Sequence, residues 1–247
     1  MKVNVTIPCL NEEAQLASSV HTLLDFLGAR CRFRHEIVIA DNGSTDKTWE
    51  IAGTLCAQHV DVRRTHVDQK GRGRAVKKVW FESDCDVLTY MDVDLATDLS
   101  AFPPMVEAIV SGGFDLAVGS RVLKSGLTTR GLKREFISRA YNWLIRLLFR
   151  PSFSDAQCGF KAIGRDAARA VLPMVEDDGW FMDTELLLLA DRLGYRIFDC
   201  PVRWVDDPDS RVALWKTALL DLKGLLRLRR KFAQRRPVHQ FQQLHQK

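Results

Sequence analysis

Residues 88–98 read LTYMDVDLATD, an apolar segment that leads directly into two carboxylates one residue apart. The apolar residues up to Met91 predict a strand of an open sheet, so Asp92 and Asp94 stand where its carboxyl end turns into a loop. Side chains two positions apart in an extended chain share a face, and two such carboxylates repel unless a cation lies beside them. A hard divalent ion such as Mg2+ or Mn2+ relieves that repulsion and keeps coordination positions open for phosphate oxygens. The alternative is structural, with Asp98 capping the next helix and the pair an ordinary loop feature.

Strand and helix patterns alternate through the first half of the chain. Alternating apolar residues predict short strands, and runs with apolar residues on one helical face follow them. The predicted strands cover residues 2–7, 36–40, 60–65, 88–91 and 116–119, and the predicted helices cover residues 12–27, 45–56, 75–83 and 103–111. Asn11 is predicted to cap the first helix. This order calls for an α/β fold with a mostly parallel, Rossmann-like central sheet flanked by helices.

Two further charged residues follow strands at the same edge of the predicted sheet. Asp41 opens the turn DNGSTD, and Arg121 follows the fifth strand. Ligands in open α/β sheets gather beyond the carboxyl ends of the strands, so both side chains are expected to face one crevice with Asp92 and Asp94. The alternative for Arg121 is an ion pair with one of these three carboxylates.

A basic, glycine-rich turn reads QKGRGRA at residues 69–75. Gly71 lets the backbone come close to a ligand, and Lys70 together with the N-terminus of the following helix suits a phosphate group. The alternative is a solvated turn without a ligand, because a basic glycine loop alone is a weak signal.

Polar residues recur on one face of a helix predicted to begin near residue 130. Arg134, Ser138 and Asn142 are spaced by four and therefore share a helical face, beside an apolar surface of the same helix. A cation and a hydroxyl one turn apart beside apolar side chains suit the phosphate of a lipid. The alternative is a core helix with a polar outer stripe.

Two acidic residues open an apolar helix that continues to residue 193. Asp183 either caps this helix or points into the site, and Glu185 lies two residues beyond it. The last predicted strand covers residues 195–205 and leads into a polar loop that contains Arg211.

The net charge is unevenly divided along the chain. Residues 1–123 contain 13 Lys and Arg against 17 Asp and Glu, whereas residues 124–247 contain 23 against 14. The basic half suits an anionic partner such as a membrane surface or a phosphorylated acceptor. Nucleic acid is not expected as a partner, because no zinc finger, aromatic RNP strand or recognition helix accompanies the charge.

A leucine-rich helix predicted over residues 214–232 concentrates this basic charge. Residues 216–236 hold eight cations and one acid, Asp221. Such a helix can lie in a membrane interface by burying its leucines and placing its cations near anionic headgroups. Each cation contributes about 1 kcal/mol to the free energy of membrane binding. The alternatives are that it packs on the domain or contacts a protein partner.

Length and composition fit one α/β domain with a short extension. The 247 residues are 46% hydrophobic, and we divide them into a catalytic domain at 1–212, a basic amphipathic helix at 213–236 and a disordered tail at 237–247. No leader segment and no stretch of about 18 apolar residues is recognised, so we expect a cytoplasmic chain, peripheral at the cytoplasmic face of a membrane. The six cysteines have no C-x-x-C spacing and predict reduced thiols, not a zinc site or a disulfide framework.

Three short motifs at the predicted strand ends resemble those of family 2 inverting glycosyltransferases, which have the GT-A fold. Residues 8–12 (PCLNE) are similar to P-x-x-N-E, residues 41–46 to D-(D/N)-(G/N)-S-x-D, and residues 92–94 to D-x-D. Further along, DAQCGFK at residues 155–161 resembles dolichyl-phosphate β-glucosyltransferases, with dolichyl-phosphate mannosyltransferases as near neighbours. Ala96 departs from the resemblance, because many relatives have a Gln there that helps to hold the metal.

The resemblance implies a role for each candidate residue. It implies donor-binding residues around the nucleotide base, the ribose and the phosphates: Pro8, Asn11, Glu12, Asp41, Lys70, Gly71, Asp92 and Arg211. It implies catalytic residues around the metal and the acceptor phosphate: Asp92, Asp94, Arg121, Arg134, Ser138 and Asp183. Of these, Asp94 with Asp92 would ligate Mg2+ or Mn2+.

The implied reaction transfers a hexose to a polyprenyl phosphate with inversion at the anomeric carbon. Glucose is the first expectation for the hexose, and the donor would be UDP-glucose or GDP-mannose. A phosphate acceptor is already anionic at neutral pH, so no strong general base is required. Three alternatives remain open. They are mannose transfer from GDP-mannose, transfer to a saccharide hydroxyl with Asp183 or Glu185 as the base, and a non-catalytic subunit that binds nucleotide sugar.

Overall fold

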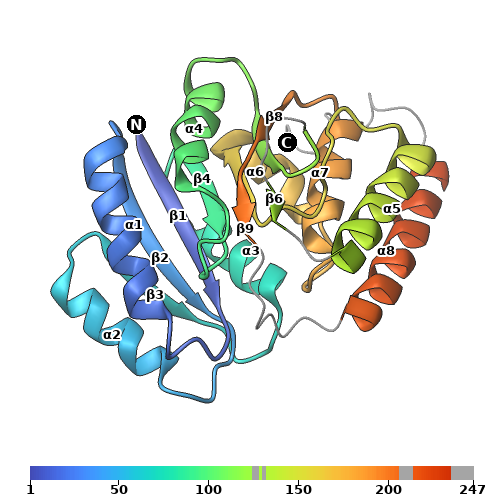
Figure 1. Cartoon of the computed structure of the whole chain (residues 1–247). Helices are drawn as coiled ribbons and strands as arrows, with labels where there is room; N and C mark the ends of the chain where they lie inside the picture. The colour runs from blue at the N-terminus through green and yellow to red at the C-terminus, as the bar shows by residue number, and fades with distance from the viewer. Residues whose placement is uncertain (124–127, 130–131, 206–213, 235–247) are drawn as a thin grey trace.

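The computed structural model describes the chain apart from residues 124–127, 130–131, 206–213 and 235–247 (Figure 1). The strands are β1 (Lys2–Cys9), β2 (Arg34–Asp41), β3 (Val62–His66), β4 (Val87–Met91), β5 (Leu116–Ser120), β6 (Thr128–Thr129), β7 (Phe160–Gly164), β8 (Ile197–Pro201) and β9 (Trp204–Val205). The α-helices are α1 (Leu16–Arg30), α2 (Thr48–Gln58), α3 (Arg72–Glu82), α4 (Phe102–Val110), α5 (Leu132–Phe149), α6 (Arg165–Val171), α7 (Met182–Arg192) and α8 (Leu214–Gln234).

A mixed sheet of seven strands forms the centre of the described chain, in the order β3-β2-β1-β4-β7-β5-β8. The pairs β1–β2, β1–β4, β2–β3 and β5–β8 are parallel, whereas β7 runs antiparallel to both β4 and β5. The strands β6 and β9 form a separate parallel pair. The predicted mostly parallel sheet flanked by helices is confirmed, and the insertion of β7 between β4 and β5 adds a feature that the hydrophobic pattern did not predict.

The core is built around β1, which pairs with β2 on one side and β4 on the other. Val3, Val5 and Ile7 of β1 are fully buried, and burial of such a side chain contributes about 1.5–3 kcal/mol. Helices pack on the sheet, with α3 against β1 and β2 and with α4 against β5 and β7. This packing holds the ends of the central strands in fixed positions.

The carboxyl ends of the parallel strands meet at one edge of the sheet. β2 ends at Asp41, and β4 ends at Met91, directly before Asp92. Because β7 is antiparallel, its first residue, Phe160, pairs with Met91, and the segment before β7 therefore arrives at the same edge. This topology places residues 155–159 next to the loop that follows β4.

Three predicted helix starts are wrong, and one of them is α2, which begins at Thr48 and not at residue 45. α1 begins at Leu16 with Gln15 as its N-cap, so Asn11 does not cap it. Asn11 instead has a φ of 57°, and its side-chain oxygen accepts a hydrogen bond from the backbone N–H of Thr45 at 2.8 Å. α3 begins at Arg72, three residues earlier than predicted, which brings that arginine into the first helical turn.

The strand predicted over residues 195–205 is divided in two. β8 ends at Pro201, and the chain then leaves β5 and approaches the loop after β4. The N–H of Asp98 donates to the carbonyl of Arg203 at 3.0 Å, and Thr97 forms a bridge with Trp204. The segment 203–205 therefore lies against the loop that carries the D-x-D motif.

The helices α5 and α8 lie side by side at one end of the molecule (Figure 1). The rings of Phe149 and Phe232 meet edge to face, with centroids 5.8 Å apart. The described part of α8 lies within the helix predicted at 213–236, and the predicted tail at 237–247 lies outside the described residues. Among the described residues, no helix is long and apolar enough to cross a membrane.

Candidate active site

Arg72 connects two carboxylates at the carboxyl edge of the sheet. Its two terminal nitrogens donate to Asp92 Oδ1 at 2.5 Å and to Asp183 Oδ2 at 2.6 Å. The guanidinium lies over the rings of Tyr90 and Trp180, at 4.8 Å from each centroid. Arg72 is only 9% exposed, so a residue from α3, the loop after β4 and the first turn of α7 share one buried charge cluster.

Asp183 is the most enclosed carboxylate of this cluster. The hydroxyl of Tyr90 donates to its Oδ1, and Lys161 Nζ lies 3.2 Å from the same oxygen. Burial opposes ionisation, yet the pKa of Asp183 is lowered because Lys161 and Arg72 stabilise the charged form. Phe181 is the N-cap of α7, so Asp183, in the first helical turn, does not cap this helix, and its place in the catalytic site stays a prediction.

Asp92 is held by Arg72 and remains partly exposed. Its side chain is 41% exposed, and Arg72 occupies Oδ1. A Cβ atom added at Gly159 would lie 1.8 Å from Asp92 Oδ2, so only glycine leaves room for that oxygen. The glycine of the segment before β7 is therefore part of how Asp92 is placed.

Asp94 lies two residues further, in a tight turn. Leu95 has a φ of 48°, and the N–H of Ala96 donates to Asp94 Oδ1 at 3.0 Å. The side chain of Ala96 offers no ligand atom, and the residue contributes through its backbone. The side chain of Asp94 is half-buried in this turn.

The acidic residues of this edge fit a hard divalent ion that shares its coordination with a substrate. Within the described residues, no group of three or more His, Cys, Asp or Glu side chains forms a complete metal cage. Mg2+ is usually bound through one or two carboxylates, with waters and substrate phosphates completing its octahedron. Asp94 and the second oxygen of Asp92 provide that number of carboxylates.

Asp41 closes the end of β2 and is fully buried. Its Oδ2 lies 2.6 Å from Nδ1 of His66, and the N–H of Ser44 donates to its Oδ1 at 3.4 Å. The side chain of Asn42 accepts a hydrogen bond from the N–H of Gly71 at 2.7 Å. The basic glycine turn is therefore fixed against the end of β2, as its predicted role as part of the donor site requires.

The motif at residues 8–12 reaches the same region from β1. Pro8 pairs with Ala40 in the β1–β2 register. The N–H of Glu12 donates to Oγ1 of Thr48 at 2.8 Å, and Asn11 contacts the turn after β2 as described above. Lys70 is exposed at the rim. Thus, the ends of β1 and β2 and the glycine turn form one contiguous surface.

Arg121 forms an ion pair, but not with the predicted partners. Its Nε and one terminal nitrogen donate to the two carboxylate oxygens of Asp155 at 2.7 and 3.0 Å. Burial alone raises the pKa of Asp155, and the two-pronged contact with Arg121 more than offsets it, so the pKa lies well below its usual range. The expectation of a pair with Asp41, Asp92 or Asp94 is corrected to Asp155, which belongs to the DAQCGFK segment.

The helix α5 brings part of its polar face toward that segment. Asn142 is buried, and its Oδ1 accepts a hydrogen bond from the N–H of Ala156 at 3.1 Å, so at this position the polar face is directed inward. Ser138, one turn earlier, is half-buried. Arg134 lies on the same helix with its side chain outside the described part, and Arg211 lies in the undescribed segment 206–213.

The sequence did not predict four residues of the cluster, which are Arg72, Tyr90, Lys161 and Trp180. Lys161 carried a usable signal, because a lysine inside an apolar strand needs a buried carboxylate partner. Its strand, β7, is buried from Phe160 to Ile163, and Lys161 is 2% exposed. The sequence identifies Arg72 only as one of several cations in a basic turn, because its two partners lie 20 and 111 residues away along the chain.

Comparison with known proteins agrees with this geometry. Residues 4–172 match the family model "Glycosyl transferase family 2". Glycosyltransferase AglD of Haloferax volcanii is 40% identical over 224 residues, which are 89% of this chain and 35% of that protein. The dolichyl-phosphate beta-glucosyltransferase of Mus musculus is 30% identical over 249 residues, 94% of this chain and 76% of that protein. The chain thus spans about a third of AglD and about three quarters of the mouse relative.

Solved structures with a similar fold are more distant in sequence. Glucosyl-3-phosphoglycerate synthase of Mycobacterium tuberculosis, solved in complex with UDP, matches with a TM-score of 0.67 at 21% identity, over 91% of this chain and 79% of that one. A mannosyltransferase of Pyrobaculum calidifontis in complex with GDP-Man and Mn2+ matches with a TM-score of 0.55 at 17% identity, over 88% and 60%. The predicted GT-A fold is confirmed, and with the match of the family model over most of the chain, we conclude that the chain belongs to glycosyl transferase family 2.

Proposed function

We propose that this chain transfers glucose from a nucleotide diphosphate sugar, UDP-glucose in the first instance, to a polyprenyl phosphate, with inversion at the anomeric carbon. The observation that carries the proposal is the meeting of Asp92, Arg72, Asp183 and the Arg121–Asp155 pair at one edge of the sheet. Several relatives are named dolichyl-phosphate beta-glucosyltransferases, in mouse and in yeast. A fold neighbour was solved with Mn2+ and UDP-glucose.

The donor nucleotide is assigned to the surface at the ends of β1 and β2. Pro8, Asn11, Glu12 and Asp41 would border the base and ribose, and Lys70 with Gly71 would lie near the phosphates. The hydrogen bond from Gly71 to Asn42 supports this assignment, because it keeps the glycine turn beside Asp41. Glycine is needed at this point, since a Cβ would lie 2.6 Å from the carbonyl of Asp178.

The divalent ion is assigned to Asp94, with the open oxygen of Asp92 as its second carboxylate. When bound, Mg2+ or Mn2+ would offset the negative charge that develops on the leaving diphosphate. Asp92 and Asp94 hold the donor in place, and Arg72 keeps one oxygen of Asp92 occupied. The metal dependence of the reaction is part of the proposal.

The acceptor phosphate is assigned to Arg121, Arg134 and Ser138, with Arg211 near the phosphates of the donor. Arg121 stays positively charged in its buried pair, because Asp155 raises its pKa despite burial. A cation fixed in a buried pair stabilises phosphate without the cost of ordering a flexible side chain. This arrangement supports an acceptor that carries its own negative charge.

The ionisation of Asp183 argues against an acceptor that must lose a proton. A general base works best when its pKa lies near the working pH. The pKa of Asp183 is lowered, and its two oxygens are bonded to Arg72, Tyr90 and Lys161. Transfer to a saccharide hydroxyl with Asp183 as the base is therefore the less favoured alternative.

Helix α8 is assigned to the membrane surface. Its buried side includes Leu225 and Leu228, and its outward side combines two neighbouring stripes. One stripe is apolar and exposed, with Leu219, Leu222 and Leu226. The other stripe is basic and includes Lys223 and Arg230. An interfacial helix needs this combination of exposed leucines and cations.

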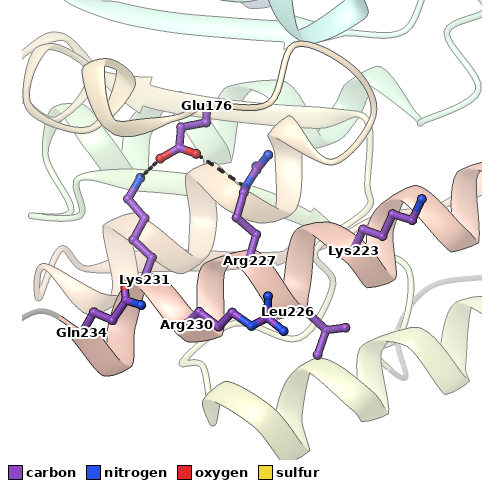
Figure 2. Close-up of a pocket in the computed structure, with 7 residues that line it drawn as sticks. All are labelled: Glu176, Lys223, Leu226, Arg227, Arg230, Lys231 and Gln234. Atoms are coloured by element: carbon purple, nitrogen blue, oxygen red, sulfur yellow. Dashed lines mark hydrogen bonds and ion pairs between the residues drawn. The ribbon is translucent and has the colours of Figure 1, made fainter.

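A hollow of about 600 Å³ follows the basic stripe (Figure 2). It is lined by side chains at a helical spacing along α8 and by one acid from the segment before α7: Lys223, Leu226, Arg227, Arg230, Lys231, Gln234 and Glu176. Glu176 pairs with Lys231 at 2.5 Å and with Arg227 at 3.6 Å, as Figure 2 shows. In the described part of the chain, Lys223 and Arg230 have no ion pair, so both are available to an anionic headgroup.

The activity is tested by a donor screen. The protein is incubated with polyprenyl phosphate, Mg2+ or Mn2+ and either UDP-glucose or GDP-mannose, and the mass of the lipid product is measured. We expect a gain of one hexose with UDP-glucose and none after chelation of the metal. Product from GDP-mannose alone would favour the mannosyltransferase alternative, and UDP binding without product from any donor would favour a non-catalytic subunit.

The membrane assignment is tested separately by sedimentation with vesicles. Vesicles that contain anionic lipid are expected to carry down the wild-type chain, and Lys223→Glu with Arg230→Glu is expected to reduce the bound fraction several-fold. Arg169→Glu, an exposed arginine on α6, is the matched control and should bind as the wild type does. Equal binding of all three proteins would contradict the assignment of α8.

A further inference from the structure

We propose that Arg72 is a positioning residue that holds the carboxylate of Asp92 in one orientation for the donor. The inference rests on the proposed function and adds to it a residue outside the three motifs. It concerns how the first aspartate of the D-x-D motif is held before a ligand binds. The evidence is the hydrogen bond from Arg72 to Oδ1 and the close packing of Gly159 against Oδ2.

Arg72 is itself fixed by its surroundings. It donates to Asp92 and to Asp183 through different terminal nitrogens, and its planar guanidinium lies over Tyr90 and Trp180. A guanidinium presents several donors in a rigid fork, so two bonds in two directions set its orientation. Because Arg72 is only 9% exposed and donates to Asp92 directly, we assign its effect on the donor to Asp92.

Gly159 packs against the other oxygen of Asp92. A Cβ at position 159 would lie 1.8 Å from Oδ2, so any other residue would displace the carboxylate. Arg72 at Oδ1 and the glycine at Oδ2 therefore restrict the rotation of the carboxylate, while the side chain stays 41% exposed. A carboxylate held in this way has a defined orientation, as a ribose hydroxyl or a metal ion requires.

The two partners of Arg72 depend on it to different degrees. Asp183 also contacts Tyr90 and Lys161, so its charge remains compensated when Arg72 is removed. For Asp92, by contrast, Arg72 provides the one ion pair found within the described residues. Loss of Arg72 should therefore act mainly on Asp92, which is free to rotate once its charge-assisted hydrogen bond is lost.

The test measures UDP binding by calorimetry in the presence of Mn2+, independently of turnover. Arg72→Gln is expected to weaken UDP binding about tenfold, in line with the usual value of a hydrogen bond to a charged group. Arg72→Lys keeps the charge but cannot donate as a rigid fork, so a smaller loss is expected. Arg165→Gln removes the arginine that pairs with Asp86 at the other end of β4 and is the matched control, with unchanged binding.

A double-mutant cycle separates positioning from a general structural role. If Arg72 acts through Asp92, Arg72→Gln weakens UDP binding in the wild-type background and has no further effect in Asp92→Ala. An equal loss in both backgrounds overturns the inference, as does unchanged binding in Arg72→Gln. If Arg72→Gln fails to fold, the same cycle is made with Arg72→Lys.

The outcomes also distinguish this inference from the proposed function. Wild-type protein that binds no UDP with Mn2+ overturns the donor site and, with it, the role of Arg72. Wild-type binding that is insensitive to Arg72 overturns the positioning role alone. In steady-state assays, the positioning role predicts that the KM for UDP-glucose rises more than kcat falls, whereas a loss of folded protein lowers the apparent kcat without changing KM.

Discussion

The two ends of β4 each carry an aspartate paired with an arginine, but the two pairs differ in what they leave open. At the amino end, Asp86 binds Arg165 through Oδ1 and accepts a hydrogen bond from the backbone N–H of Lys2 through Oδ2. At the carboxyl end, Asp92 binds Arg72 through Oδ1, and its Oδ2 lies where a Cβ at position 159 would stand. Both oxygens of Asp86 are engaged in hydrogen bonds, whereas the side chain of Asp92 stays 41% exposed beside its one arginine.

This difference follows from topology. The amino end of β4 joins β1 and β7 through their backbones, with Asp86 donating its N–H to the carbonyl of Lys2 and accepting at its carbonyl from the N–H of Arg165. The carboxyl end opens onto loops and helix starts, where dipoles and charges gather beyond parallel strands. An aspartate–arginine pair thus stabilises the strand ends at the amino edge of the sheet, and a second such pair lies in the candidate active site at the carboxyl edge.

The largest effect is expected from Asp94→Ala at the open end. We expect transfer to fall about a thousandfold, because this change removes the carboxylate assigned to the metal and with it stabilisation of the leaving diphosphate. Since Asp94 is partly exposed, the melting temperature should change little. The hexosyl transfer rate and the thermal melt are measured on the same preparation. Near-wild-type transfer in this variant would refute the assigned role.

Asp183→Asn should reduce stability more than any change at the amino end of β4. The substitution leaves the buried Lys161 without its carboxylate, and breaking a buried pair in this way costs about 3 kcal/mol or more. Urea unfolding at pH 7 measures the difference from wild type. Because the pKa of Asp183 is lowered by folding, its stabilisation is present above the unfolded value of about 3.9 and is lost as pH falls below it. The difference between the two proteins should therefore shrink as pH falls from about 4 through the lowered pKa of the folded state, and a constant difference would contradict this reasoning.

Residues at the open end were predictable to different degrees from the sequence. Asp41, Asp92 and Asp94 could be placed together because parallel strands end at one edge. The partner of Arg121 could not be predicted, because Asp155 reaches that edge only through the antiparallel β7. Strand order is not encoded in hydrophobic periodicity. Most helix and strand segments were found, whereas the division of residues 195–205 depends on pairing with the distant loop after Asp94.

The cluster around Arg72 shows a second limit of prediction. Tyr90 fits its strand as an apolar residue, and nothing in the pattern indicates that its hydroxyl contacts Asp183. Trp180 lies in a segment without periodic signal and is 47% exposed. These contacts arise from packing between elements far apart in sequence, and they give Asp183 partners that hydrophobic periodicity does not predict.

Asp221 extends the comparison, because it is a buried carboxylate with which no arginine of the described residues forms an ion pair. It lies on α8, where the side-chain amide of Gln157 donates to Oδ2 at 3.0 Å and Oδ1 has no hydrogen-bond partner among the described residues. Burial raises its pKa to about 7. A raised pKa in the folded state makes stability fall as pH increases from the unfolded value of about 3.9 toward 7.

Asp221→Asn should therefore stabilise the protein at high pH. The neutral amide keeps an acceptor for Gln157 and removes the charge, so we expect a gain of about 1–2 kcal/mol at pH 8. Near pH 4 the two proteins should unfold at nearly the same urea concentration, because Asp221 is then protonated in the folded state. A gain of the same size at both pH values would mean that burial of charge is not the cause.

The smallest effect is expected at the closed end, from Arg165→Gln. The side chains of Arg165 and Asp86 are 32% and 30% exposed, so water screens the pair, and its loss should cost about 1 kcal/mol in urea unfolding. Asp86 keeps the hydrogen bond from Lys2, and the donor site at the opposite edge is not touched. UDP binding and transfer should remain within about twofold of wild type. If Arg165→Gln reduced UDP binding as much as Arg72→Gln, an arginine at either end of β4 would act on the site through the strand itself, and the functional distinction between the two ends would be wrong.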